Sequence, residues 1–119
     1  TGKLKPLVLK VEIPNFRIVR LDSLSGLNKE AKIFVVVDSN STDFQLKLLC
    51  NDLRERYETF SSIIICIYTN NDIGIKLANG RSDNLDLDDQ KRAWLVMYSY
   101  NLVEGEYYDN LPSSYLGEI

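Results

Sequence analysis

The chain has 119 residues, of which 45% are hydrophobic and 26% charged, and its formal net charge is −3. This length predicts one domain with its own hydrophobic core, because domains typically run to about 100–150 residues, and the apolar fraction is too high for a disordered chain. The sequence contains no histidine. Ser-His-Asp catalysis, Cys-His catalysis and histidine metal sites are therefore excluded.

The N-terminal part of the chain predicts strands. Residues 1–14 form an arm in which residues 7–13 alternate between apolar and polar, as in a half-buried strand. Residues 16–21 resume an extended pattern, and residues 22–31 have the composition of a loop. Residues 33–37 are apolar throughout, which is typical of a central strand buried on both faces.

A capping box gives the clearest local signal, with Thr42 as the helix N-cap and Gln45 three residues later. We expect a helix over about 43–58. Its apolar stripe is formed by Leu46, Leu49, Cys50, Leu53, Tyr57 and Phe60, and its polar side carries Lys47, Asn51, Arg54, Glu55 and Glu58. The stripe predicts packing on one face of a sheet.

The second half predicts further strands. Residues 63–69 are apolar throughout, residues 73–78 alternate, and Asn79-Gly80 is typical of a two-residue hairpin turn. Residues 81–91 are polar and acidic, which predicts a loop. Residues 92–101 predict a last strand, with Trp94, Val96, Tyr98 and Tyr100 on one face, and residues 102–119 look irregular.

These elements predict an α+β fold with the order β-β-β-α-β-β-β. A mixed sheet of five or six strands would carry one long helix on one face, with the strands at 33–37 and 63–69 parallel because the helix connects them. Residues 15–101 would form the domain and residues 102–119 a tyrosine-rich segment packed on it. Because both central strands are apolar on both faces, the second face also needs a cover. We expect that cover to be residues 102–119, with a second molecule as the alternative.

No motif indicates a cofactor. The two cysteines, Cys50 and Cys66, do not form a CxxC pair, so we expect no zinc or haem site. We predict that both thiols are buried near each other across the helix–sheet interface and are reduced. A disulfide between them is the alternative. The sequence lacks phosphate-binding glycine motifs and a GxSxG elbow, and residues 83–89 do not fit an EF-hand loop. We therefore expect no metal.

Charge is unevenly distributed along the chain. Residues 1–20 carry Lys3, Lys5, Lys10, Arg17 and Arg20 against Glu12 alone, whereas residues 82–119 are strongly acidic. We expect the basic and acidic parts to lie near each other. A basic arm that contacts nucleic acid or lipid headgroups is the alternative, but the whole chain lacks the basic footprint of strong nucleic-acid binding. No stretch is long enough to predict a transmembrane segment.

Tyrosine gathers near the C-terminus, where five of the seven tyrosines fall within residues 98–115. Tyrosine offers a large contact area with a polar tip, which suits recognition surfaces. The candidate ligand-binding residues are Trp94, Tyr98, Tyr100, Asn101, Tyr107, Tyr108 and Asp109. They predict a non-enzymatic binding or accessory domain for a protein or small polar ligand, as a monomer or weak homodimer. The other interpretation is that these tyrosines only pack the tail onto the sheet.

A carboxylate-dependent hydrolase is the alternative function. Its candidate acids are Asp86, Asp88, Glu104 and Glu106. Glycosidase-type chemistry needs two carboxylates that flank the scissile bond, so two of these acids would have to converge within about 10 Å.

Several short segments carry a resemblance to a known group of domains. They are Ile67-Tyr68-Thr69, Gly74 with Leu77-Ala78-Asn79-Gly80, Tyr98-Ser99-Tyr100-Asn101 and Gly105-Glu106-Tyr107. From Phe16 onward the chain resembles small bacterial α+β domains of unknown function, often found in exported or lipid-anchored proteins. The resemblance implies an extracytoplasmic location and no catalytic residue.

Overall fold

The computed structural model describes residues 12–24 and 29–116. Within these ranges the chain forms β1 (Phe16–Leu24), β2 (Glu30–Val37), α1 (Asp43–Arg56), β3 (Ser62–Thr69), α2 (Asp72–Ala78), α3 (Leu87–Ala93), β4 (Trp94–Asn101), β5 (Gly105–Asp109) and the 3-10 helix η1 (Pro112–Leu116). The fold is α+β, as the sequence predicts.

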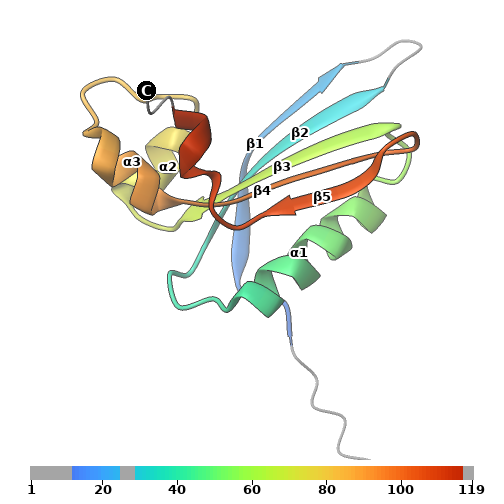
Figure 1. Ribbon diagram of the computed structural model, residues 1–119, viewed down its shortest axis with the longest axis horizontal. Helices are drawn as coiled ribbons and strands as arrows, with labels where there is room; N and C mark the ends of the chain where they lie inside the picture. The colour runs from blue at the N-terminus through green and yellow to red at the C-terminus, as the bar shows by residue number, and fades with distance from the viewer. Residues whose placement is uncertain (1–11, 25–28, 117–119) are drawn as a thin grey trace, which may run out of the picture.

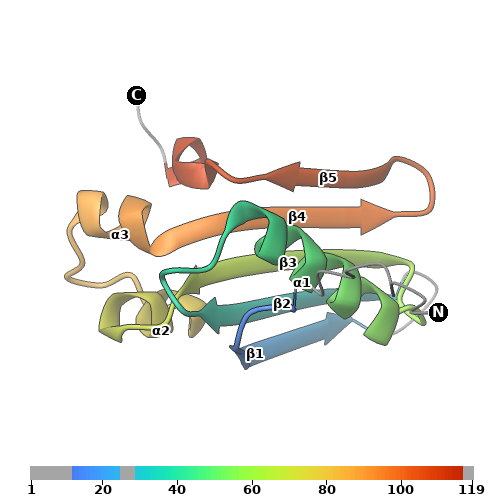
Figure 2. The same cartoon turned by 90° about the horizontal axis from the view of Figure 1, so that it is seen from below.

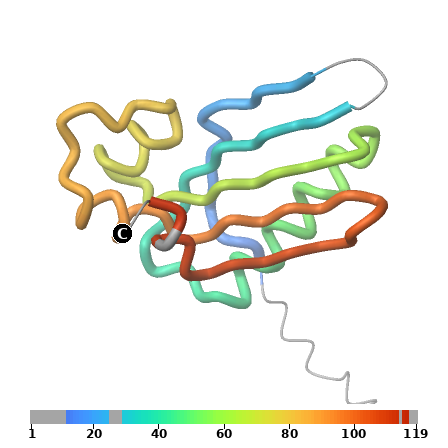
Figure 3. The backbone as a smooth tube through the Cα atoms, turned by 45° about the horizontal axis from the view of Figure 1, so that its top comes forward, coloured from blue at the N-terminus to red at the C-terminus, as the bar shows by residue number. Residues whose placement is uncertain are grey.

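The five strands form one mixed sheet in the order β1-β2-β3-β4-β5 (Figure 1). β2 and β3 are parallel, as the connection through α1 requires. The other neighbours are antiparallel. Figure 3 shows the β4–β5 connection at one end of the sheet, with α2 and α3 at the other end.

The predicted capping box is confirmed. Thr42 Oγ1 accepts a hydrogen bond from the Gln45 amide at 3.2 Å, and Gln45 Oε1 accepts one from the Thr42 amide at 2.9 Å. The helix ends at Arg56, slightly before the expected end at 58. α1 packs on one face of the sheet (Figure 2), where its buried residues Leu46, Leu49, Cys50 and Leu53 join the apolar side chains of β2, β3 and β4 in the main core.

The prediction of a strand at residues 73–78 is wrong, because these residues form α2. The side chain of Asn71 caps this helix by accepting a hydrogen bond from the Gly74 amide at 2.8 Å. A Cβ atom at Gly74 would lie only 1.7 Å from the Thr69 carbonyl oxygen, so glycine allows the helix to turn back directly against β3. Asn79-Gly80 ends this helix instead of forming a hairpin, with Gly80 at a φ of +78°.

Other expected boundaries also change. The loop expected at 81–91 contains the start of α3, and the irregular segment at 102–119 contains β5 and η1. The loop expected at 22–31 is partly strand, since β1 and β2 extend into it. Of the strand expected at 7–13, residues 7–11 lie outside the described residues, and 12–13 belong to no helix or strand. The observed order is β-β-α-β-α-α-β-β, so the single-helix prediction is wrong.

The described residues cover the second face of the sheet at one end only. There α2 forms a small core with β2 and β3, built on the buried residues Val36, Tyr68 and Ala78. η1 packs beside this core, because the Tyr115 ring lies 5.9 Å from the Trp94 ring, which in turn stacks on Tyr68. Of the described residues 102–116, only η1 acts as the expected cover, because β5 joins the sheet as its edge strand.

The rest of the second face is less apolar than the sequence suggests. Its middle row runs across all five strands as Asp22, Lys32, Ile64, Ser99 and Tyr107. Both Lys32 and Tyr107 are exposed. In the next row, the guanidinium of Arg20 lies 4.0 Å above the ring of Phe34 and shields it.

The two cysteines lie on opposite faces of the sheet, which contradicts the predicted proximity. Cys50 is fully buried in the core under α1. Cys66 packs on the second face and is only partly buried. Because side chains alternate along a strand, the residues of β3 that face α1 are Ile63, Ile65 and Ile67. Both thiols are free.

Candidate functional site

The predicted binding residues divide between the two faces of the sheet. Tyr98, Tyr100 and Tyr108 pack toward α1, whereas Trp94 packs in the core under α2. The side chains of β4 change faces at a bulge. Ile67 pairs with Val96 and Tyr68 pairs with Trp94, so Leu95 is an extra residue without a partner on β3, and Trp94 faces the other side of the sheet from Tyr98. The prediction that Trp94 shares a face with Tyr98 is therefore wrong.

The three remaining candidates, Asn101, Tyr107 and Asp109, have evident local roles. Asn101 closes the β4–β5 turn, since its Oδ1 accepts hydrogen bonds from the amides of Val103 and Glu104 at 3.0 and 2.7 Å. Asp109 Oδ1 accepts from the Leu111 amide at 2.8 Å. The Tyr107 hydroxyl lies 3.3 Å from that of Tyr115. These contacts shape the hairpin and place η1.

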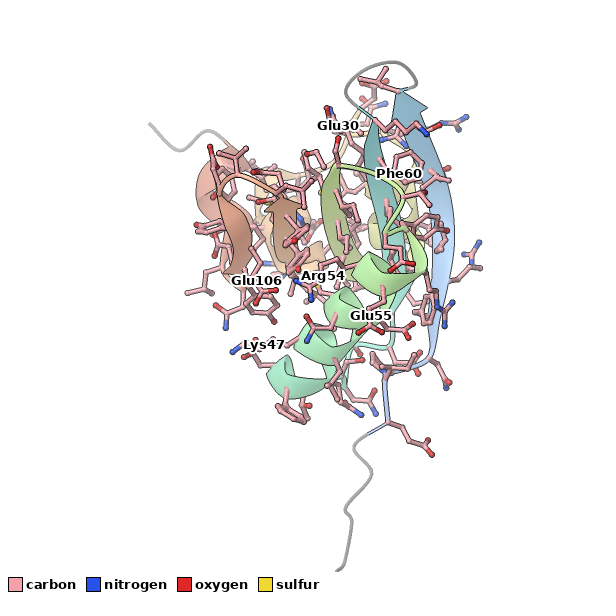
Figure 4. All side chains as sticks on the ribbon, turned by 90° about the vertical axis from the view of Figure 1, so that its right-hand side faces the viewer. Glu30, Lys47, Arg54, Glu55, Phe60 and Glu106 are labelled. Carbon is pink, nitrogen blue, oxygen red and sulfur yellow. The ribbon has the colours of Figure 1, made fainter. Side chains whose placement is uncertain are left out.

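The predicted residues on the α1 side line a groove. Figure 2 shows that α1 lies across the sheet but not over β5. Two neighbouring hollows lie between the side chains of α1 and those of the β4–β5 hairpin. Together we call them the helix–hairpin groove. Its first hollow has a volume of about 370 Å³ and is lined by Lys47, Asn51, Tyr98, Glu106 and Tyr108. Its second hollow, of about 360 Å³, is lined by residues 54–55, 58–61, 63, 100 and 102. The two hollows meet where Arg54 contacts Glu106 (Figure 4).

Glu106 is the central polar group of the groove. Its Oε2 accepts a hydrogen bond from the Tyr98 hydroxyl at 2.9 Å and lies 3.3 Å from Arg54 Nη1. Burial raises the pKa of Tyr98, and the hydrogen bond to Glu106 raises that pKa further. Tyr98 therefore stays protonated and serves as a fixed donor.

A second polar cluster closes the groove near the start of α1. The Tyr108 hydroxyl donates to Asp43 Oδ1 at 2.7 Å, and Asn110 donates to the same oxygen at 3.1 Å. Lys47 Nζ lies 3.5 Å from Asp43 Oδ2 and 5.1 Å from the centre of the Tyr108 ring. The hydrogen bond from Tyr108 is the main reason why the pKa of Asp43 lies below its usual value.

The second hollow is more apolar. Its walls include the side chains of Phe60, Ile63, Tyr100 and Leu102, and Glu55 and Glu58 lie among its lining residues. The guanidinium of Arg54 lies 4.7 Å from the centre of the Tyr100 ring, which fixes the ring at the junction of the two hollows. The groove thus changes from polar to apolar along α1.

The four candidate acids of the hydrolase alternative are not gathered in the groove. Of these four acids, only Glu106 lines the groove. Asp86 and Asp88 lie at the start of α3, near the other end of the sheet (Figure 1). Glu104 is exposed in the β4–β5 turn. Within the described ranges, no three cysteine, aspartate or glutamate side chains are grouped so that they could hold a metal.

The residues on the α1 side of the groove are not among the binding residues that the sequence predicts. Lys47, Asn51, Arg54 and Glu58 recur at intervals of four, three and four residues, so they form one stripe beside the apolar stripe. This stripe is the sequence feature that could have indicated the groove. Its residue types are equally typical of a helix face that is simply exposed to solvent.

Comparison with known proteins found no relative. No family model, curated protein or solved structure matches the chain. The resemblance to exported α+β domains therefore stays a prediction. In residues 12–24 and 29–116, no helix is both long and apolar enough to cross a membrane.

Proposed function

We propose that this protein is a non-enzymatic binding module that recognises an extended segment of a partner protein in the helix–hairpin groove. The observation that carries this proposal is the polar-to-apolar groove, lined by three tyrosines of β4 and β5. Two of their hydroxyls are held by carboxylates, and the third ring is held by a guanidinium.

These contacts support recognition because they fix the tyrosines before a partner arrives. Tyr98 and Tyr108 donate hydrogen bonds to Glu106 and Asp43. Their hydroxyl oxygens can therefore still accept hydrogen bonds from donors of a partner. A surface that is ordered before binding loses less side-chain entropy when it binds. Tyrosine also adds a large contact area at low entropic cost.

The form of the groove favours an extended segment over a small molecule. Small-molecule sites usually enclose most of their ligand's surface, whereas both hollows open to solvent beside the helix. The two hollows follow one another along α1. A peptide can place successive side chains in both, which a compact ligand cannot do.

Selection of peptides from a random displayed library tests this proposal. The selected peptides should bind the protein, and Asn51→Trp should weaken their binding at least about tenfold by filling the first hollow. Lys76→Trp is the matched control. It adds the same side chain at an exposed position of α2, and it should leave binding unchanged.

Two results would contradict the groove as the recognition site. One is that no peptide is enriched on the folded protein. The other is that enriched peptides bind the Asn51→Trp variant as tightly as the unmodified protein.

A further inference from the structure

We propose that the second hollow of the groove binds a cationic segment of the partner protein, in which an aliphatic side chain is flanked by lysine or arginine. This inference rests on the function proposed above and adds the chemistry of the partner. It follows from the apolar lining of the hollow, the charge at its rim and the end of α1 that borders it.

The lining of the hollow offers a place for one aliphatic side chain. Ile63 is buried, while Phe60 and Tyr100 are only partly buried, so their rings expose apolar area inside the hollow. Leu102 is 77% exposed and stands at the tip of the hairpin. Asn101 holds the backbone of that tip through two hydrogen bonds. An aliphatic side chain between these residues would remove apolar surface of both partners from water.

The rim of the hollow carries negative charge without partners. Glu55 and Glu58 are exposed, and neither makes an ion pair or hydrogen bond with any residue in the described ranges. Among the described residues that line the hollow, Arg54 is the one basic residue, and its charge is offset by Glu106. Cations are therefore favoured at the rim and anions are repelled.

The end of α1 strengthens this preference. The helix ends at Arg56, and residues 58–61, which follow it, line the hollow. The last carbonyl groups of a helix lack partners within the helix and give its C-terminus a partial negative charge. A lysine or arginine of the partner would meet both this charge and the two glutamates.

Three capped synthetic peptides provide the probes. They are Gly-Lys-Leu-Lys-Gly, its charge-reversed form Gly-Glu-Leu-Glu-Gly, and Gly-Lys-Gly-Lys-Gly, which lacks the aliphatic side chain. Each is titrated to millimolar concentration into the isotope-labelled full chain, and amide chemical shifts are recorded. The Lys-Leu-Lys peptide should shift the signals of residues 55–61 and 100–102, with weaker binding at higher salt. The other two peptides should bind much more weakly.

Charge-neutralising variants locate the site. The double variant Glu55→Gln with Glu58→Gln should weaken binding of the Lys-Leu-Lys peptide by about two- to tenfold, since each exposed charge pair contributes modestly to affinity. The control is Asp83→Asn with Asp88→Asn, which changes the net charge equally at the other end of the sheet and should leave binding unchanged. Matching amide spectra would show that both variants are folded.

The outcomes separate this inference from the proposed function. Equal binding of the Lys and Glu peptides, or equal effects of the two double variants, would overturn the cationic preference and leave the groove as a peptide site. No shift in residues 55–61 with any peptide would overturn the inference too. Binding that appears only after Lys3, Lys5 and Lys10 are changed to Gln would show that the chain's own basic segment is the occupant, and the partner proposal would be wrong.

Discussion

The Tyr108 hydroxyl donates a hydrogen bond of 2.7 Å to Asp43 Oδ1, although the two residues are 65 positions apart in the chain. Asp43 is the first residue of α1, and Tyr108 lies on the edge strand β5. This contact joins the start of the helix to the last strand of the sheet. It therefore fixes one end of the helix–hairpin groove.

This contact predicts a pH-dependent contribution to stability. The pKa of Asp43 is lower in the folded protein than its usual value of 3.8, so the ionised carboxylate stabilises the fold above that value. The contribution is lost as the pH falls below 3.8 through the folded pKa. Asp43→Asn should lower the free energy of unfolding at pH 6 by less than about 1 kcal/mol, because the carboxylate is half exposed. The difference should shrink below pH 3.8 in urea unfolding curves.

Tyr108→Phe provides the control for this pair. The double variant should show coupling between the two positions at pH 6, since either single change breaks the same hydrogen bond. A stability difference that stays constant from neutral to acid pH would mean that Asp43 acts through its shape or its helix position alone.

The start of α1 is the part of the fold that the sequence predicts best. Thr42 and Gln45 satisfy each other's backbone amides within four residues, so no distant contact is needed to place them. Thr42→Ala should lower the free energy of unfolding by about 1 kcal/mol, measured by chemical unfolding. Thr42→Ser keeps the hydroxyl acceptor and should behave like the unmodified protein. Equal stability of all three forms would show that the cap contributes little.

The region of α2 is less predictable because its conformation depends on a tertiary contact. Residues 73–78 alternate in polarity like a strand, but Gly74 permits a close approach to Thr69 that no periodic pattern reveals. The short length of α2, seven residues, also gives helical periodicity little room to show. Its helical start instead depends on the side chain of Asn71.

The candidate site could be predicted only in part for a similar reason. The tyrosine-rich part of the sequence falls on the β4–β5 hairpin, although the sequence predicts no hairpin there, and three of the seven predicted residues line the groove. Strand alternation cannot reveal the register irregularity at Tyr68, which turns Trp94 to the other face. Nor does it show that β5 extends the sheet beyond α1, which is what opens the groove.

The two thiols should differ in reactivity. Cys50 is fully buried, and burial raises the pKa of its thiol to about 12. Burial also raises the pKa of Cys66, but this side chain is only partly buried, on the second face. A small disulfide reagent should therefore modify Cys66 first, and Cys50 only through unfolding. Cys66→Ala should remove the faster phase. Equal rates for both thiols would contradict the difference in burial between them.

The packing of η1 on the second face can be followed through Trp94, the only tryptophan of the chain. The centre of its ring lies 6.1 Å from that of Tyr68 and 5.9 Å from that of Tyr115. Tyr115→Ala removes one of these neighbours, so Trp94 fluorescence should shift to longer wavelength and become more accessible to iodide, with a loss of stability of about 0.5–1 kcal/mol. Tyr115→Phe keeps the ring and loses only the hydroxyl contact with Tyr107, so its emission should remain like that of the unmodified protein. An unchanged spectrum in Tyr115→Ala would mean that η1 does not cover Trp94 in solution, and the second face would then need another cover at this end.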